Sequence, residues 1–328
     1  MANLHFANFV CRSDKQVFLD FAEVIVPAIE KGAVRKYGDS QYILKDCSVI
    51  NLASKGEVPD LVLAGRIIHN TMLVREQHLV DGEIVKDRTA LPSAPSAIFV
   101  LMFDTHRLIY APETKGAPSL QALRATIHRA IRDRWNDYLR EKKAEIERST
   151  DKRVTLKQLR EDEPEPKLTI LPLSNESSIE KFLDGFSVLR QVKLELIKPN
   201  DEIDSMEWLK ATRDIGGDFG ASDASVTYAN KSGLNIEGAA TRIAEMTENG
   251  NTDVSLRGLD ANGDQLTGNN DHFKITVPTD DIPADVKSAA PKLVGILREK
   301  AVEGLVHLPK VTDDIKSKLR RIGEFLSL

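Results

Sequence analysis

The 328-residue sequence contains few cysteines and few aromatic residues, and each shortage excludes a class of protein. The two cysteines, Cys11 and Cys47, form no Cys-x-x-Cys pair, which excludes a four-cysteine zinc site and a thioredoxin-type redox centre. They can be two reduced thiols or one disulfide, and a cytosolic setting favours the thiols. Aromatic residues make up 5% of the chain, which argues against a carbohydrate cleft lined by aromatic rings.

Long hydrophobic runs are also absent. The longest, residues 96–103 (SAIFVLMF), has the length of a strand and falls short of the ~20 residues that cross a membrane. The first residues show no basic stretch ahead of an apolar one, so no signal peptide is expected. The chain is 41% hydrophobic and 29% charged, as is typical of soluble globular proteins. We therefore expect a cytoplasmic protein with no membrane span and no cofactor.

The hydrophobic pattern predicts an α+β fold. Short apolar stretches spaced like β-strands run through residues 1–118, and Asp81-Gly82 predicts a two-residue hairpin turn between two of them. These features favour an N-terminal antiparallel sheet with helices. The longest helical pattern then begins after Ser119, a suitable N-cap, and continues to about residue 143.

A change of composition divides the chain into two predicted domains. Residues 161–166 (EDEPEP) are acidic and contain two prolines, which a helix does not accommodate, so we interpret them as a linker. Residues 168–196 follow as strand, helix and alternating strand, a pattern typical of half of a split ferredoxin-like sheet. We predict a β-rich N-terminal domain, residues 1–163, that ends in a long basic helix over 119–160. A C-terminal α+β domain, residues 164–328, would contain a split β-α-β-type sheet with helices.

The net charge of −5 conceals an uneven distribution. Residues 1–118 contain 13 basic and 14 acidic residues, a net charge of −1. Residues 119–160 contain 12 and 6, which gives +6, and residues 161–328 contain 20 and 30, which gives −10. One strongly basic segment therefore lies in an otherwise acidic protein, and the acidic remainder would repel a polyanion from every other surface.

The basic segment is expected to place its cations on one side of a helix. At ~100° per residue, the other side is an apolar stripe formed by Leu120, Leu123, Ile127, Ile131 and Tyr138, with Trp135 at its edge. Arginine donates bidentately to phosphate and stays charged, so the row suits backbone contacts to nucleic acid, which require no reading of sequence. The candidate nucleic-acid-binding residues are Arg129, Arg132, Asn136, Arg140, Lys143, Arg148, Lys152 and Arg153.

The same row also has a purely structural interpretation. Most charged rows on amphipathic helices are solvated faces with ion pairs between residues four apart. Asp133 and Asp137 are expected to point to the side of the basic row, not into it, so both interpretations stay open. The acidic residues available for pairing are Asp133, Asp137, Glu141 and Glu145.

Motifs for catalysis or metal binding are weak. Residues 260–271 (DANGDQLTGNND) have acidic side chains at partial EF-hand spacing, but Gln265 stands where that loop needs glycine. Asn262-Gly263 instead predicts a hairpin tip. The seven histidines show no metal-binding spacing and no Gly-x-Ser-x-Gly motif occurs, so we assign no catalytic residue, metal site or cofactor.

A resemblance adds an expectation of function. Residues 252–264 (TDVSLRGLDANGD) are similar to a stretch of the RexA-like phage-exclusion proteins of lambda lysogens, and the elements over 94–118 and 168–196 follow a similar order. The chain also resembles a bacterial family catalogued as a domain of unknown function, through residues 171–176 (LPLSNE) and 268–273 (GNNDHF). The resemblance implies a cytoplasmic, dimeric DNA-binding protein that acts without sequence preference in defence against phage. It implies no catalytic residue.

Our leading hypothesis is therefore a homodimeric protein that binds the phosphate backbone of double-stranded DNA in anti-phage defence or phage exclusion. One alternative is a metal-dependent nuclease, although nothing in the sequence establishes an enzyme. Another is an interaction protein whose basic helix pairs with the acidic half of a second subunit, giving a salt-sensitive homodimer without affinity for DNA. The sequence identifies no membrane or effector partner protein.

Overall fold

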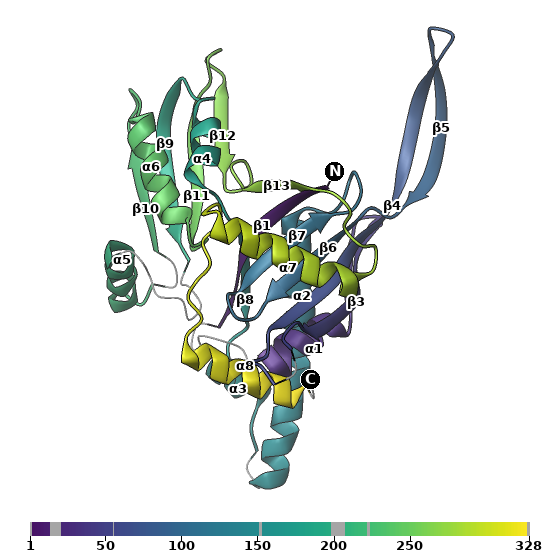
Figure 1. Ribbon diagram of the computed structural model, residues 1–328, viewed down its shortest axis with the longest axis vertical. Helices are drawn as coiled ribbons and strands as arrows, with labels where there is room; N and C mark the ends of the chain where they lie inside the picture. Colours follow the sequence, from purple (N-terminus) through teal and green to yellow (C-terminus); the bar gives the residue numbers. More distant parts are fainter. Residues whose placement is uncertain are drawn as a thin grey trace.

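The computed structural model describes residues 2–13, 21–54, 56–150, 153–197, 207–221 and 224–326. It confirms the α+β class, because helices and strands are both common and the described strands form two antiparallel sheets (Figure 1). The larger sheet occupies the centre of the molecule, and the smaller one lies at the upper left of Figure 1. None of the helices in these ranges is long and apolar enough to cross a membrane.

The first sheet takes its strands from both ends of the chain. They are β1 (Ala2–Arg12), β2 (Val34–Tyr37), β3 (Ser40–Asn51), β4 (Leu61–Val80), β5 (Glu83–Ser93), β6 (Ser96–Met102), β7 (Arg107–Pro112), β8 (Lys167–Pro172) and β13 (Thr276–Thr279). The order is β13-β1-β7-β6-β4-β3-β2, with β8 also beside β1 and β5 also beside β4. The first half of β4 pairs with β3 and β6, whereas its second half leaves the sheet and pairs with β5.

Helices cover both faces of this sheet. One face carries a short π-helix η1 (Phe21–Ile25) with α1 (Val26–Glu30), α2 (Leu120–Ser149), α3 (Leu156–Asp162) and α8 (Asp313–Phe325), and the other carries α7 (Val286–Val302). Successive residues of a strand point to opposite faces, so Phe99 joins the core under α2 while Ile98 and Val100 join the core under α7. Burial on both faces explains why residues 96–103 are continuously hydrophobic.

The second sheet has the order β10-β9-β11-β12. Its elements are β9 (Val188–Leu196), β10 (Ala224–Ala229), β11 (Thr252–Leu259) and β12 (Gln265–Asn269), with α4 (Glu176–Leu183), α5 (Glu207–Asp218) and α6 (Ile236–Thr247). Along β9, Val192, Leu194 and Leu196 are buried as their alternation predicts, and the first two pack into a core with α4 and α6. The opposite face of the sheet has no such core in the described residues and carries polar side chains.

The sheets do not divide at the predicted boundary between residues 163 and 164. β8 pairs with β1 from Ala7↔Pro172 to Arg12↔Lys167, and β13 pairs with the start of the same strand. Consequently β8 lies in the first sheet and β9 in the second, so residues 168–196 do not form the predicted β-α-β unit of a single sheet. The residues between β8 and β13 supply the second sheet, while the chain returns to the first sheet for α7 and α8.

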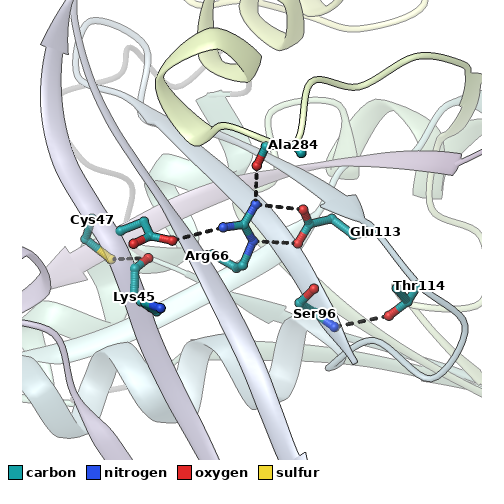
Figure 2. A network of polar contacts seen from close by, with 8 residues as sticks. Lys45, Cys47, Arg66, Ser96, Glu113, Thr114 and Ala284 are labelled. Carbon is teal, nitrogen blue, oxygen red and sulfur yellow. Dashed lines mark hydrogen bonds and ion pairs between the residues drawn. The ribbon is translucent and has the colours of Figure 1, made fainter. Parts of the chain in front are cut away.

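Arg66 of β4 makes a network of polar contacts to neighbouring segments (Figure 2). Its guanidinium donates to Glu113 at 2.8 and 2.9 Å, to Asp46 of β3 at 3.0 Å and to the Ala284 carbonyl ahead of α7 at 2.5 Å. The arginine side chain is 17% exposed, so these charge-assisted bonds are partly shielded from water. Nearby, burial raises the pKa of the Cys47 thiol to about 12, and both cysteines are free.

A buried polar junction connects the two sheets. Arg107, at the start of β7, is fully buried and donates to the carbonyls of Asn249 and His307, both at 3.3 Å. Beside it on β1, the amide of Asn8 donates to Gly250 O at 3.2 Å and Asn251 Oδ1 at 2.8 Å. Gly250 has φ +67°, and a Cβ there would lie 2.7 Å from the Asn8 side chain, so only glycine fits.

Replacing Arg107 should weaken the whole fold. Arg107→Met keeps the length of the side chain but removes the buried donors to the Asn249 and His307 carbonyls, so we expect a loss of about 3 kcal/mol in the free energy of unfolding. Urea unfolding followed by circular dichroism measures this. The control Arg242→Met removes an arginine whose side chain is 71% exposed and should change stability by less than about 0.5 kcal/mol. Equal effects of the two substitutions would contradict a central role for Arg107.

Candidate nucleic-acid interface

Helix α2 is amphipathic in the way that its sequence predicts. Ser119 caps it, its side chain accepting from the backbone N–H of Ala122 at 3.1 Å. Trp135 lies fully inside the buried stripe, where its ring N–H donates to the Glu163 carbonyl at 3.2 Å. The opposite side is exposed at Arg129 and Arg140. The buried residues of α2 are Leu120, Leu123, Thr126, Ile127, Ala130, Ile131, Trp135 and Leu139.

The predicted cations stand beside carboxylates. Spacings of three and four residues bring side chains together on a helix, so Asp133 and Asp137 reach into the basic row, and the expectation that they point aside is wrong. We call Arg129, Arg132, Arg140 and Lys143 the α2 basic face. Its ion pairs are Arg129–Asp133 at 2.8 Å, Arg132–Glu165 at 3.8 Å, Arg140–Asp137 at 3.0 Å and Lys143–Glu147 at 2.9 Å.

These ion pairs lie in solvent. The side chains of Arg129 and Asp133 are 52% and 57% exposed, and those of Arg140 and Asp137 are 67% and 45% exposed. Exposed pairs contribute only about 0–1 kcal/mol, because water screens the attraction and the side chains lose freedom. Breaking each pair therefore costs little, although the freed carboxylate stays on the helix near the cation and opposes a phosphate. The α2 basic face is thus a solvated row whose partners are exchangeable.

The other candidate residues lie around this face. Asn136 uses both ends of its amide within the chain: Nδ2 donates to Arg132 O at 2.9 Å, and Oδ1 accepts from Arg160 at 3.1 Å. Asn136 therefore joins α2 to α3 and is less free to contact a ligand. Arg148 and Arg153 are exposed. Lys152 lies outside the described residues.

A second group of cations gathers on the outer face of the second sheet. Arg190, Lys231 and Arg257 line a hollow of about 640 Å³ together with three amide side chains, those of Gln191, Asn230 and Gln265. No carboxylate stands among the described residues that line it, and none of the three cations has an ion pair within the part of the chain that the structure covers. This strand hollow is therefore a second candidate anion site, and its cations need not leave a carboxylate to bind one.

An irregularity in the sheet creates the hollow. Arg257 pairs with Gln191 but the next residue, Gly258, pairs with Leu189, so β9 has one extra residue, Arg190. Such a bulge turns two successive side chains to the same side, here Arg190 and Gln191. A Cβ on Gly258 would lie 2.1 Å from a backbone oxygen of β9, so the bulge requires glycine at this position. Lys231 is carried by an ordered turn, in which Asn230 Oδ1 accepts from Ser232 N at 3.0 Å.

Sequence reasoning missed the strand hollow for a physical reason. Its cations lie far apart along the chain, on β9, after β10 and on β11, and periodicity within a single element does not bring them together. The only local signal was Arg257-Gly258, since a glycine inside a strand pattern often marks a bulge. The resemblance to the RexA-like proteins covered Arg257 without giving it a role.

The predicted hairpin tip at residues 260–264 is confirmed. β11 and β12 pair from Ser255↔Asn269 to Leu259↔Gln265, and the turn closes on itself. The Asp260 carboxylate accepts the backbone N–H groups of Asn262 and Asp264, both at 2.9 Å. This carboxylate is therefore engaged in holding the turn.

Comparison with known proteins identifies no relative. No protein-family model matches the chain, and no curated protein matches it either. The resemblance to the RexA-like proteins accordingly stays a hypothesis.

Proposed function

We propose that the protein binds double-stranded DNA without sequence preference, through phosphate contacts to the α2 basic face. The observation that supports this most strongly is that cations on one side of α2 are paired with solvent-exposed carboxylates, which a phosphate can replace. At 1.5 Å per residue, Arg129 to Lys143 spans about 20 Å. That length of duplex axis carries roughly 12 phosphate charges, so the face can contact several at once.

The driving force would be the release of counterions from the duplex. Each phosphate neutralised by Lys or Arg frees condensed cations, so affinity falls steeply with salt and does not depend on base sequence. The carboxylates beside the row reduce its net charge and keep the affinity moderate. The strand hollow offers a second phosphate contact on the same chain.

The cellular role that we propose is anti-phage defence or phage exclusion by a cytoplasmic homodimer. It rests on the resemblance to the RexA-like proteins in residues 252–264 and in the order of elements. A dimer would present the α2 basic face twice and would raise the avidity for a duplex without any new contact.

Removing the α2 cations should abolish most of the binding. For the triple variant Arg129→Ala, Arg132→Ala and Arg140→Ala, we expect a large loss of duplex affinity and a decrease of roughly 3 in the slope of log K against log salt. The measurement is fluorescence anisotropy of a labelled duplex over a series of salt concentrations. Folding should be unaffected, because all three arginines belong to exposed pairs.

The matched control changes the net charge equally at other sites. Arg242→Ala, Lys300→Ala and Lys316→Ala also remove cations paired with carboxylates three residues away, but on α6, α7 and α8. This variant should retain the duplex affinity and the salt slope. A comparison variant, Arg190→Ala, Lys231→Ala and Arg257→Ala, tests the strand hollow. If only that variant loses affinity while the α2 variant binds normally, the assignment to α2 is wrong.

Neutralising the carboxylates should have the opposite effect. Asp133→Asn, Asp137→Asn and Glu147→Gln remove the acidic partners of Arg129, Arg140 and Lys143, so we expect duplex affinity to rise by about tenfold or more at moderate salt. The same anisotropy assay measures this. Unchanged affinity would show that DNA does not approach this side of α2.

The defence role is tested in cells. Bacteria that express the protein should lower the plating efficiency of at least one phage, and the α2 triple variant should restore plating at equal protein levels. Restoration by the α2 variant but not by its matched control would connect DNA binding to exclusion. Equal protection by the α2 variant and the wild-type protein would separate the two activities.

A further inference from the structure

An apolar β-ribbon stands out from the body of the molecule. It consists of residues 71–93, the second half of β4 and β5, and at the upper right of Figure 1 it projects clear of the other described elements. Asp81 and Gly82, with φ of 51° and 86°, form its tip, as the sequence predicts. All of its residues are described, and not one of them is buried.

The ribbon carries more exposed hydrophobic area than any other described element. Eight of the fifteen large hydrophobic residues that are exposed in the described chain lie on it, with exposures between 41% and 70%. Cross-strand pairing places Leu73 opposite Leu91, and Leu79 opposite Ile84, on one face. The eight residues are Met72, Leu73, Val74, Leu79, Val80, Ile84, Val85 and Leu91.

Both faces of the ribbon are apolar. Side chains alternate along a strand, so Leu73 and Leu79 lie on one face of β4 while Met72, Val74 and Val80 lie on the other. An isolated two-stranded ribbon is marginally stable in water, and exposed apolar strands with open edges invite pairing with another chain. The ribbon is therefore suited to bind a partner on both of its faces.

The charges on the ribbon indicate what kind of partner it takes. It contains three basic and four acidic residues, a net charge of −1. Arg75 pairs with Asp87 at 2.5 Å and Arg88 with Glu76 at 3.8 Å, while the tip is acidic at Asp81. With a net charge of −1 the ribbon does not attract a polyanion, so it fits a protein surface.

We infer that the ribbon is a dimerisation arm, and that its partner is a second copy of this chain. The exposed side chains leave on the order of 700 Å² of apolar surface per copy, close to the roughly 800 Å² that each partner buries in a standard interface. A two-fold axis uses the same patch on both copies, and the nearly neutral ribbon does not repel its own image. The acidic residues 161–328, with a net charge of −10, would repel theirs.

Two exposed hydrophobic residues also lie near the base of the ribbon. On the edge strand β2, Val34 and Tyr37 are 60% and 68% exposed, and they point to opposite sides of the strand. The β2–β3 hairpin is fixed to the ribbon by Ser40 and Thr71, whose hydroxyls lie 3.0 Å apart. With two copies, one face of each ribbon can lie against the other ribbon, and its second face against the edge strand β2 of the other copy. Both apolar faces are then covered at once.

Sedimentation velocity of the full chain without DNA tests the inference. The wild-type protein should be a dimer at micromolar concentrations. The variant Leu73→Thr, Leu79→Thr, Ile84→Thr and Leu91→Thr removes one apolar face while keeping strand-forming residues, and should dimerise at least about a hundredfold more weakly. The control Val302→Ser and Phe325→Ser, which also removes exposed hydrophobic residues, should leave the dimer intact.

A second measurement does not depend on the folding of the variant. In wild-type protein, amide hydrogen exchange over residues 71–93 should speed up on dilution to the monomer, and exchange in the second sheet should not. Three results would each overturn the inference. They are a wild-type protein that is monomeric at all concentrations, a quadruple variant that still dimerises, and a wild-type dimer whose ribbon amides exchange at the same rate before and after dilution. A monomer that still binds duplex would overturn the inference and leave the proposed DNA binding intact. A dimer that binds no duplex would contradict the proposed DNA binding and leave the inference intact.

Discussion

The buried contacts of Arg107 and Asn8 determine how the two sheets are joined. A polar group inside a protein must find a partner, because leaving it unpaired costs far more than the net gain from a hydrogen bond. Arg107 meets carbonyls at Asn249 and His307, and Asn8 meets residues 250 and 251. These partners follow α6 and α7, so β1 and β7 hold the end of the second sheet and the C-terminal segment in one arrangement.

Strand pairing crosses the boundary that the sequence predicts between residues 163 and 164. A linker at residues 161–166 appears plausible from its prolines, yet β8 begins directly after it and pairs with β1. β1 accepts β7 and β13 at one part of its length and β8 at another, so its two edges are filled by strands from three regions of the chain. Sequence patterns report which residues form strands but carry little information on which strand pairs with which.

Local features were predictable where one element decides the outcome. The Ser119 cap, the apolar stripe of α2 and the hairpin turns at residues 81–82 and 262–263 depend on neighbouring residues only, and the structure has all of them. The length of β4 does not follow from its local pattern, because His69 and Asn70 interrupt its apolar residues. The strand in fact continues to Val80, since pairing with β5 replaces the buried neighbours that the sheet supplies earlier. The strand hollow could not be predicted either, because its residues come from different elements and only strand pairing brings them together.

Salt affects the α2 basic face and the ribbon differently, because the first acts through charge and the second through hydrophobic contact. A cationic face that is already paired with carboxylates binds phosphate weakly, since each contact must first displace an acidic neighbour. Joining two such faces makes the second binding event intramolecular, with an effective concentration that reaches the millimolar range for closely linked sites. Hydrophobic association is insensitive to moderate salt, whereas the phosphate contacts are screened by it. A dimer held by the apolar ribbon would thus persist at salt concentrations that release DNA. Ionic strength would then control DNA binding without dissociating the dimer on which the avidity depends.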